Sequence, residues 1–242
     1  MRLYIGTSGW HYPHWKGRFY PETLPLSQWF AFYTRHFNTV EINYTFYHMP
    51  TESTLDRWRA QAPRGFRYTL KASRVITHRP TKPGSRGYLT YLLCRRARRL
   101  EDHLGVLLFQ FPPEAPWDPE LLAEIRRRCA SERLAFEFRN PEVLTHPDLP
   151  QELERLKAAL CVALAPGLPV VFRQTADFVY LRFHGVHRWY RDRLTPEDLR
   201  PFADFARQAL DQGHEVFAYF NNDYRAYAPE NALEFRRMVE TG

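Results

Sequence analysis

Polar and apolar residues alternate along residues 39–50, TVEINYTFYHMP. Aliphatic and aromatic side chains occupy the even positions from 40 to 46, whereas Glu41, Asn43, Thr45 and Tyr47 occupy the odd positions. A period of two is typical of a β-strand whose two faces meet different surroundings. The pattern predicts a strand with one polar face, which a surface strand would turn to water and a barrel strand would turn inward.

Seven other segments have strand character, and several of them repeat this polar face. They are residues 3–9, 66–73, 105–111, 134–139, 161–165, 178–184 and 215–221. Helices are predicted between most of the strands, at residues 26–37, 52–62, 88–102, 119–130, 151–160, 195–213 and 229–240. Residues 166–176 have no clear helical pattern, so the helix after the sixth strand is expected to be abbreviated.

Alternating strands and helices imply parallel strand pairing with right-handed crossovers. Eight such units close best into a single (β/α)8 TIM-type barrel, which is an α/β fold, and a length of 242 residues suits one such barrel. No internal repeat and no linker-like segment interrupts the pattern. We therefore predict one domain over residues 1–242.

The charge balance favours anionic partners. The chain has 34 lysine and arginine residues against 27 aspartate and glutamate residues, a net charge of +7. Most of the basic residues are arginine, whose guanidinium group binds phosphate or carboxylate through two parallel hydrogen bonds.

The cysteines suggest a cytoplasmic protein. Cys94, Cys129 and Cys161 are widely spaced and form no CxxC motif, so we expect reduced thiols, not a disulfide framework or a zinc site. The N-terminus runs directly into a strand pattern without a signal peptide, and no apolar run is long enough to span a bilayer. We expect no contact with membranes.

The polar faces of the predicted strands place charged and amide residues at the C-terminal ends, where TIM-type barrels carry their sites. Candidate acid/base residues are Glu41, Glu137 and His184. Candidate substrate-binding residues are Asn43, Thr45, Tyr47, Lys71, His78, Gln110, Arg139, Arg182 and Asn221. Burial of a charged side chain inside a barrel costs free energy unless the charge is paired. This set contains both acidic and basic residues, so pairing is possible, which favours a preorganised polar pocket.

The same residues also have structural interpretations. Glu41 and Glu137 could be buried ion-pair partners of the lysine and arginines on other strands. As an acid/base pair they would lie three strands apart, across the barrel mouth, at a spacing like that in glycosidases. His184 could shuttle protons or could be a core histidine that donates to a carboxylate.

Motifs for metals and cofactors are weak. The histidine pairs in His11-x-x-His14 and His184-x-x-His187 are loosely spaced, and HExxH, P-loop and GxGxxG motifs are absent. The turn at residues 6–9 could present backbone N–H groups to an anion, although a tight corner is its commoner use. We expect neither a metal nor a cofactor.

Basic and aromatic residues leave nucleic-acid binding open as an alternative. Arginine runs at residues 95–99 and 126–128 lie on predicted outer helices, where solvated faces are commoner than nucleic-acid footprints. The loop after the first strand contains five aromatic residues: Trp10, Tyr12, Trp15, Phe19 and Tyr20. They could stack on bases or sugars, but packing over the barrel mouth is the favoured interpretation.

Seven segments occur in a characteristic order: GTSGWHYPHWKGRFYP, FNTVEINYTFYHMP, FRYTLKASRVITH, LLFQFPP, AFEFRN, VYLRFHG and AYFNND. Together they resemble the domain-of-unknown-function 72 family (YecE-like proteins) over nearly the whole chain. The resemblance implies a TIM-type barrel similar to those of the xylose isomerase and apurinic endonuclease group, and it implies no settled activity. The metal-binding residues of those enzymes are not evident here, so their chemistry is not transferred.

The family pattern maps onto most of the candidate residues named above and onto Gly185. The chain departs from it twice. Asn140-Pro141-Glu142 stands where the family usually has a histidine and an aromatic pair, and the sixth strand ends at Ala165, where relatives often have aspartate.

The favoured hypothesis is a metal-independent acid/base enzyme of hydrolase, lyase or isomerase type. It would act on a small anionic or sugar-like, polyhydroxy substrate in a charged pocket at the C-terminal mouth of the barrel. One alternative is a protein that binds or processes nucleic acid, and a further alternative is a non-catalytic ligand-binding protein. The oligomeric state is left open.

Overall fold

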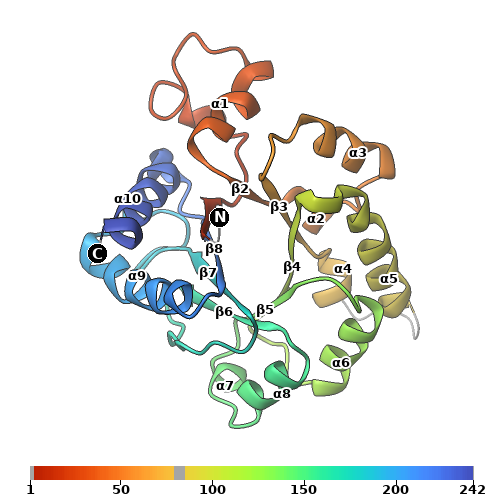
Figure 1. Ribbon diagram of the computed structural model, residues 1–242. Helices are drawn as coiled ribbons and strands as arrows, with labels where there is room; N and C mark the ends of the chain where they lie inside the picture. The colour runs from red at the N-terminus through yellow and green to blue at the C-terminus, as the bar shows by residue number, and fades with distance from the viewer. Residues whose placement is uncertain (1–2, 79–84, 242) are drawn as a thin grey trace. The chain divides into compact units, whose positions relative to one another are not determined.

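The computed structural model describes residues 3–78 and 85–241. Its strands are β1 (Leu3–Thr7), β2 (Thr39–Ile42), β3 (Arg67–Lys71), β4 (Leu104–Phe111), β5 (Leu134–Phe138), β6 (Ala159–Leu164), β7 (Phe178–Phe183) and β8 (Glu215–Phe220) (Figure 1). They follow the order β1-β8-β7-β6-β5-β4-β3-β2. This is the strand order of a (β/α)8 TIM-type barrel, so the predicted fold class is confirmed.

Helices connect most of the strands. They are α1 (Trp29–His36), α2 (Tyr44–Tyr47), α3 (Glu52–Gln61), α4 (Arg74–Thr77), α5 (Ser85–Ala97), α6 (Pro119–Arg128), α7 (Pro141–Leu144), α8 (Leu149–Arg155), α9 (Pro196–Asp211) and α10 (Tyr227–Thr241). Short 3-10 helices are η1 (Pro13–Trp15), η2 (Leu26–Gln28), η3 (Arg98–His103) and η4 (Tyr224–Ala226). No helix connects β6 to β7, where an abbreviated helix was predicted. In the part of the chain that the structure describes, no helix is both long and apolar enough to cross a membrane.

The chain forms two compact units. The first consists of Met1–Glu41, Val162–Phe172 and Asp177–Gly242, and the second of Ile42–Cys161 and Arg173–Ala176. The expectation of a single domain stays a prediction. Each unit is described below by itself.

Parallel strands form the centre of the first unit, where β1 pairs with β8 and β8 with β7. Beyond β1, Ser8 forms a parallel bridge with Glu41. Gly6 permits a close approach there, because a Cβ atom at this position would lie 2.0 Å from the Thr39 carbonyl oxygen. Helices α9 and α10 lie side by side (Figure 1), and Phe235 of α10 packs on the core of the unit.

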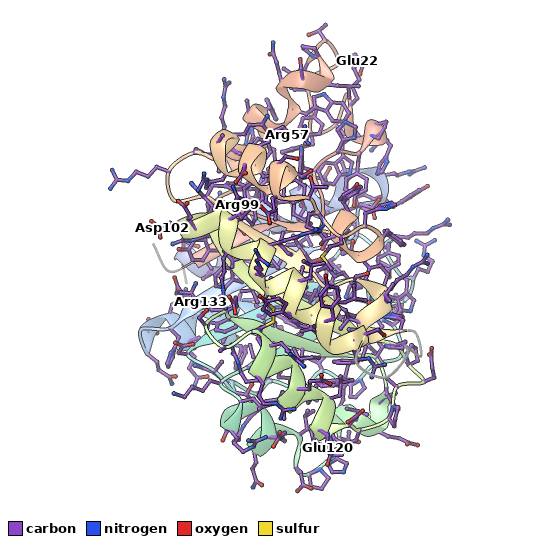
Figure 2. The ribbon with its side chains drawn as sticks, turned by 90° about the vertical axis from the view of Figure 1, so that its right-hand side faces the viewer. Glu22, Arg57, Arg99, Asp102, Glu120 and Arg133 are labelled. Atoms are coloured by element: carbon purple, nitrogen blue, oxygen red, sulfur yellow. A yellow bond between two sulfur atoms is a disulfide. The ribbon has the colours of Figure 1, made fainter. Side chains whose placement is uncertain are left out.

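The second unit is built on parallel pairing of β3 with β4 and of β4 with β5. Phe109 and Phe136 are fully buried and lie 5.7 Å apart between ring centroids. Arg57, Arg99 and Glu120 lie on its helices (Figure 2), and Arg99 of η3 pairs with Asp56 of α3 at 2.7 Å. In the described part of the chain, three arginines of the predicted basic runs have carboxylate partners: Arg98, Arg99 and Arg128.

The strand predicted over residues 39–50 is wrong beyond Ile42. Asn43 adopts helical backbone angles and begins the single turn of α2. Thr45 Oγ1 donates to the Ile42 and Lys71 carbonyl oxygens, at 2.8 and 2.7 Å, which holds this turn against β3. Alternation continues in the sequence, but a one-turn helix is too short for its period to be distinguished from that of a strand.

Two other expectations need correction. The helix predicted over residues 151–160 ends at Arg155, because Lys157 adopts a φ of 49° and breaks the helix before β6 begins. Cys94 and Cys129 form a disulfide, with a Cα–Cα separation of 5.5 Å, although reduced thiols were expected. The two cysteines are 35 residues apart, so their spacing gave no signal.

The aromatic loop after β1 packs mainly on its own unit. Trp15 and Tyr20 are buried, and the Tyr20 ring stacks on Trp29 of α1 at 4.4 Å. Phe19 contacts Phe32 of the same helix at 5.5 Å. The Phe19 and Tyr20 rings therefore pack on α1, and packing of the loop over the barrel mouth stays a prediction.

Candidate functional site

Glu41 on β2 is enclosed within the first unit, where its carboxylate accepts three hydrogen bonds. Ser8 Oγ lies 2.7 Å and Arg182 Nη2 2.5 Å from Oε1, and the Tyr180 hydroxyl lies 2.6 Å from Oε2. All four residues are buried. Burial and the neighbouring Glu41 charge raise the pKa of Tyr180 well above its ordinary value, so its hydroxyl remains a donor. We call these residues the Glu41 cluster.

The geometry of the Glu41 cluster matches the structural interpretation of Glu41 as a buried ion-pair partner. Arg182 projects from β7 and compensates the Glu41 charge in a region without solvent. Removal of one partner from such a pair leaves an uncompensated buried charge, which costs about 3–5 kcal/mol. The cluster is therefore expected to stabilise the first unit strongly.

His184 and Asn221 follow β7 and β8 and meet in the first unit. Asn221 Nδ2 lies 3.3 Å from His184 Nδ1, so the amide donates to the imidazole. His184 is fully buried. Its carbonyl oxygen accepts a 2.6 Å hydrogen bond from the Tyr190 backbone N–H, and the two rings lie 5.7 Å apart. His184 therefore fixes the position of Tyr190.

Five predicted site residues gather in the second unit: Lys71, His78, Gln110, Glu137 and Arg139. Gln110 on β4 lies opposite Glu137 on β5 in the parallel register. Glu137 Oε1 accepts a 3.0 Å hydrogen bond from Arg139 Nε. Gln110 Nε2 lies 3.3 Å from His78 Nε2. We call these five residues the β4–β5 cluster.

His78 is held as a neutral imidazole in the β4–β5 cluster. Burial, together with the neighbouring charges of Lys71 and Arg139, lowers its pKa to about 4. The Gln110 amide donates to Nε2 and to the Phe111 carbonyl oxygen. His78 Nδ1 therefore carries the proton and donates to Thr77 Oγ1 at 2.8 Å.

Helix α2 contributes a residue that was not predicted. Phe46 lies under the Lys71 ammonium group, with Nζ 4.2 Å from the ring centroid, and its ring lies 5.0 Å from that of His78. Tyr47, the predicted binding residue, is 60% exposed and lies beneath the Arg74 guanidinium group instead. The extended strand pattern placed Phe46 on the wrong face, because the chain turns at Asn43.

A cavity of 430 Å³ lies in the first unit, formed by segments that follow β1, β7 and β8. We call it the β7–β8 pocket, and its lining residues are His14, Arg18, Tyr190, Arg191, Asp223, Tyr224 and Arg225. A neighbouring cavity of 470 Å³ shares Arg191, Tyr224 and Arg225 with it. Sequence reasoning selected none of these residues as ligand-binding.

Three arginines of the β7–β8 pocket line one cavity without an ion-pair partner among the described residues. Within residues 3–78 and 85–241, no carboxylate forms an ion pair with Arg18, Arg191 or Arg225. By contrast, Arg188 nearby pairs with Asp192 at 3.2 Å. The three guanidinium groups of the pocket are therefore available to an anion from solvent.

Backbone strain is concentrated beside the same pocket. Of the five described non-glycine residues with positive φ, three lie here: Tyr190 at 66°, Arg225 at 54° and Ala226 at 62°. Left-handed backbone is unfavourable for such residues, and it occurs preferentially at functional sites, where surrounding contacts enforce it. One such contact is the 3.2 Å hydrogen bond from the Tyr224 N–H to the Tyr190 carbonyl oxygen.

His14 and Asp223 form a pair at the edge of the β7–β8 pocket. His14 Nε2 lies 2.8 Å from the Asp223 carbonyl oxygen and 3.6 Å from its Oδ2 atom. Trp15 Nε1 donates to the same carbonyl oxygen at 3.0 Å. Burial raises the pKa of the Asp223 carboxyl above its ordinary value of 3.8, and the His14 charge opposes this shift. The His14 side chain is 45% exposed and accessible to a ligand.

Similarity to proteins of known sequence assigns this chain to a family. Residues 4–242 match the family described as "Protein of unknown function DUF72". The UPF0759 protein YunF of Bacillus subtilis (strain 168) is 24% identical, over 98% of this chain and 95% of that protein. The UPF0759 protein YecE of Escherichia coli (strain K12) is 31% identical over 46% of this chain and 38% of its own length.

Solved structures agree with this result. A DUF72 family protein from Thermotoga maritima MSB8 has a TM-score of 0.89 and 28% sequence identity, covering 99% of this chain and 100% of that chain. A DUF72 family protein from Enterococcus faecalis V583 is 19% identical with a TM-score of 0.85, over 99% of this chain and 96% of that one, which shows the shared fold alone. The predicted family is confirmed: the chain belongs to the DUF72 family, whose function is unknown.

Proposed function

We propose that this chain is an acid/base enzyme that binds a small anionic substrate in the β7–β8 pocket. The observation that carries the proposal is the convergence of three arginines without carboxylate partners on one cavity beside the His14–Asp223 pair. TIM-type barrels frequently bind phosphate with the loops after strands seven and eight, where Arg191 and Arg225 lie.

Binding would use charge and geometry together. A phosphate or carboxylate group would accept paired hydrogen bonds from the guanidinium groups of Arg191 and Arg225, with Arg18 adding a third positive charge. The Tyr224 ring supports two of these guanidinium groups, at 5.8 Å for Arg191 and 5.3 Å for Arg225. The adjoining 470 Å³ cavity offers room for the remainder of the substrate.

Chemistry would use His14. When Nε2–H donates to the Asp223 carbonyl oxygen, Nδ1 holds a lone pair and can accept a proton from the substrate. The Asp223 carboxylate, 3.6 Å from Nε2, would stabilise the imidazolium ion that forms. Hydrolysis, elimination and isomerisation all use such a step, so the proposal specifies the proton transfer and the anionic group.

Two of the predicted acid/base residues, Glu41 and His184, have structural roles in this proposal. Glu41 lies in a saturated buried cluster and supports the first unit. His184 positions Tyr190, which lines the pocket. A catalytic role for Glu137, and its pairing with Glu41, stays a prediction.

Calorimetric titration of the full chain with inorganic pyrophosphate tests the binding step. We expect Arg191→Gln to weaken binding about tenfold or more, because a hydrogen bond to a charged group contributes about 1.5–3 kcal/mol. Arg200→Gln is the matched control, since Arg200 lies exposed on α9 in the same unit and lines neither cavity. Equal binding by Arg191→Gln and the control would refute the anion site.

Turnover on a panel of small phosphorylated and carboxylated compounds tests the chemical step. For any substrate found, we expect His14→Gln to lower kcat about 10²–10⁴-fold, the usual range for a general acid or base. Full turnover by His14→Gln would remove the acid/base role. A single-stranded oligonucleotide serves as a separate arm, and binding to it that falls steeply with salt would favour the nucleic-acid alternative.

A further inference from the structure

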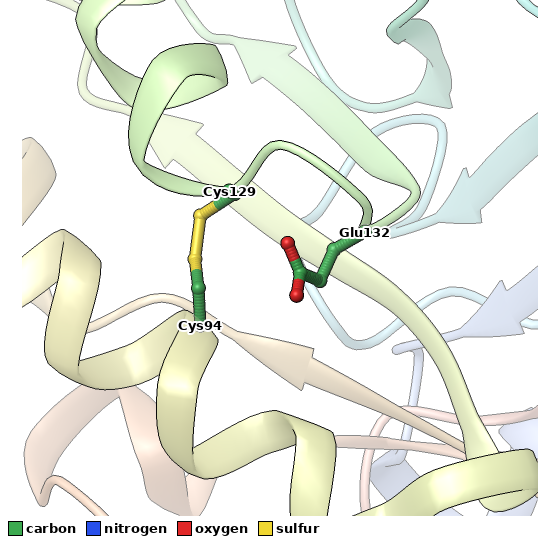
Figure 3. A group of neighbouring side chains, drawn as sticks. All are labelled: Cys94, Cys129 and Glu132. Carbon is green, nitrogen blue, oxygen red and sulfur yellow. A yellow bond between two sulfur atoms is a disulfide. The ribbon is translucent and has the colours of Figure 1, made fainter.

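The Cys94–Cys129 bond lies beside a buried carboxylate in the second unit. Cys94 belongs to the last part of α5, Cys129 caps the C-terminal end of α6, and Glu132 lies in the turn that leads into β5. The two sulfur atoms and one carboxylate oxygen of Glu132 all lie within 4.8 Å of one another. Figure 3 shows the Glu132 carboxylate next to the two sulfur atoms.

The two carboxylate oxygens of Glu132 have different surroundings. Oε1 accepts hydrogen bonds from Arg98 Nε at 2.5 Å and from Ser131 Oγ at 3.2 Å. Oε2 is buried, and among the described residues it has no hydrogen-bond partner. A buried carboxylate oxygen without a hydrogen-bond partner is costly, and coordination of a cation would offset this cost.

From this arrangement we infer that the reduced cysteine pair and Glu132 form a site for a thiophilic divalent cation such as Zn²⁺. Two thiolates and one carboxylate oxygen are three of the four ligands that zinc takes in a tetrahedral site, and solvent would supply the fourth. Soft thiolate ligands favour zinc over the hard cations calcium and magnesium.

The surroundings suit the charge of such a site. Two thiolates, one carboxylate and a divalent cation leave a net charge of −1, which the Arg98 guanidinium group compensates through Oε1. Oε2 remains for the metal, so the carboxylate keeps its hydrogen bonds while it coordinates, as metal-binding carboxylates commonly do. Arg98 is 56% exposed and the Glu132 side chain only 2%, so movement of the arginine would give the cation a path from solvent.

Loading the site requires reduction. Two electrons and two protons from a dithiol reductant break the sulfur–sulfur bond and yield two thiols, while the dithiol becomes a cyclic disulfide. Binding of the cation then releases the two thiol protons to solvent. The site therefore exists in the reduced protein and is absent from the oxidised protein.

The test uses the full chain, reduced with a dithiol that is then removed without oxygen, and titrated with Cd²⁺ or Zn²⁺. We expect one metal ion per reduced chain and a thiolate-to-cadmium charge-transfer absorption, both absent from the oxidised protein. Cys161→Ser should bind as the wild type does, because Cys161 lies outside the site. The double variant Cys94→Ser/Cys129→Ser should lose the absorption.

Glu132→Gln distinguishes a loss of metal binding from a loss of folding, because it removes one proposed ligand and leaves both sulfur atoms in place. We expect at least a tenfold loss of Zn²⁺ affinity, whereas Glu124→Gln, a change to a carboxylate on α6 outside the site, should leave affinity unchanged. The inference is overturned if reduced wild-type protein binds no metal or unfolds on reduction. It is equally overturned if Glu132→Gln binds with wild-type affinity.

Discussion

The Glu41 cluster and the β7–β8 pocket both belong to the first unit and both contain carboxylate and arginine side chains, yet their charges are satisfied differently. In the cluster, Glu41 accepts three hydrogen bonds and is sealed from solvent with Arg182. In the pocket, three arginines lack carboxylate partners among the described residues, and His14 is half exposed. Saturated, buried charge serves stability, whereas unsaturated charge beside a cavity is free to bind.

Glu41→Ala should have the largest effect on stability. It leaves the Arg182 charge buried without its carboxylate, so we expect the free energy of unfolding to fall by about 3–5 kcal/mol. Urea denaturation followed by circular dichroism measures the change. Glu230→Ala is the matched control, because its pair with Arg193 is exposed at 3.4 Å and should contribute at most about 1 kcal/mol. Similar losses of unfolding free energy in both variants would show that the buried Glu41 pair contributes no more to stability than an exposed ion pair.

Tyr180→Phe should have a smaller effect in the same cluster. It removes the hydroxyl that donates to Glu41 Oε2 while keeping the ring. We expect the free energy of unfolding to fall by about 1–3 kcal/mol, the cost of an unsatisfied buried polar group. An unchanged denaturation midpoint would show that the third hydrogen bond to Glu41 contributes nothing.

His78 extends the comparison to the second unit, where burial holds an imidazole neutral. The pKa of the His78 imidazole is about 4, below its ordinary value of 6.5. Between pH 6.5 and pH 4 this imidazole is therefore protonated in the unfolded chain but remains neutral in the folded chain. The stabilisation is therefore complete above pH 6.5 and is lost as the pH falls toward 4.

We expect His78→Gln to abolish this part of the pH dependence. The measurement is the difference in unfolding free energy between wild type and variant from pH 7 to pH 4, and the effect should be modest because the ring is half buried. A difference that stays constant over this range would contradict a lowered pKa.

Strand periodicity explains what the sequence could predict. The alternation in 178–184 placed Tyr180 on the same face as Arg182, so the polar face of β7 was visible even though its pairing with Glu41 was not. The residues of the β4–β5 cluster were likewise named as site residues, and Gln110 and Glu137 occupy the same level of adjacent parallel strands.

Periodicity fails where the chain leaves the strands. Arg18, Arg191 and Arg225 come from loops and a 3-10 helix far apart in the sequence, and left-handed backbone occurs beside two of them, at Tyr190 and Arg225. His14 was noted only for its loose spacing from His11, because its partner Asp223 lies at the other end of the chain. The Cys94–Cys129 disulfide was missed because a separation of 35 residues forms no recognisable motif.

The most direct test of the distinction between cluster and pocket is the affinity for pyrophosphate of two variants, Tyr180→Phe and Arg191→Gln, each measured well below its unfolding temperature. We expect Tyr180→Phe to be less stable but to bind as the wild type does. We expect Arg191→Gln to be as stable as the wild type but to bind about tenfold or more weakly. Wild-type affinity in Arg191→Gln together with weakened affinity in Tyr180→Phe would contradict the account.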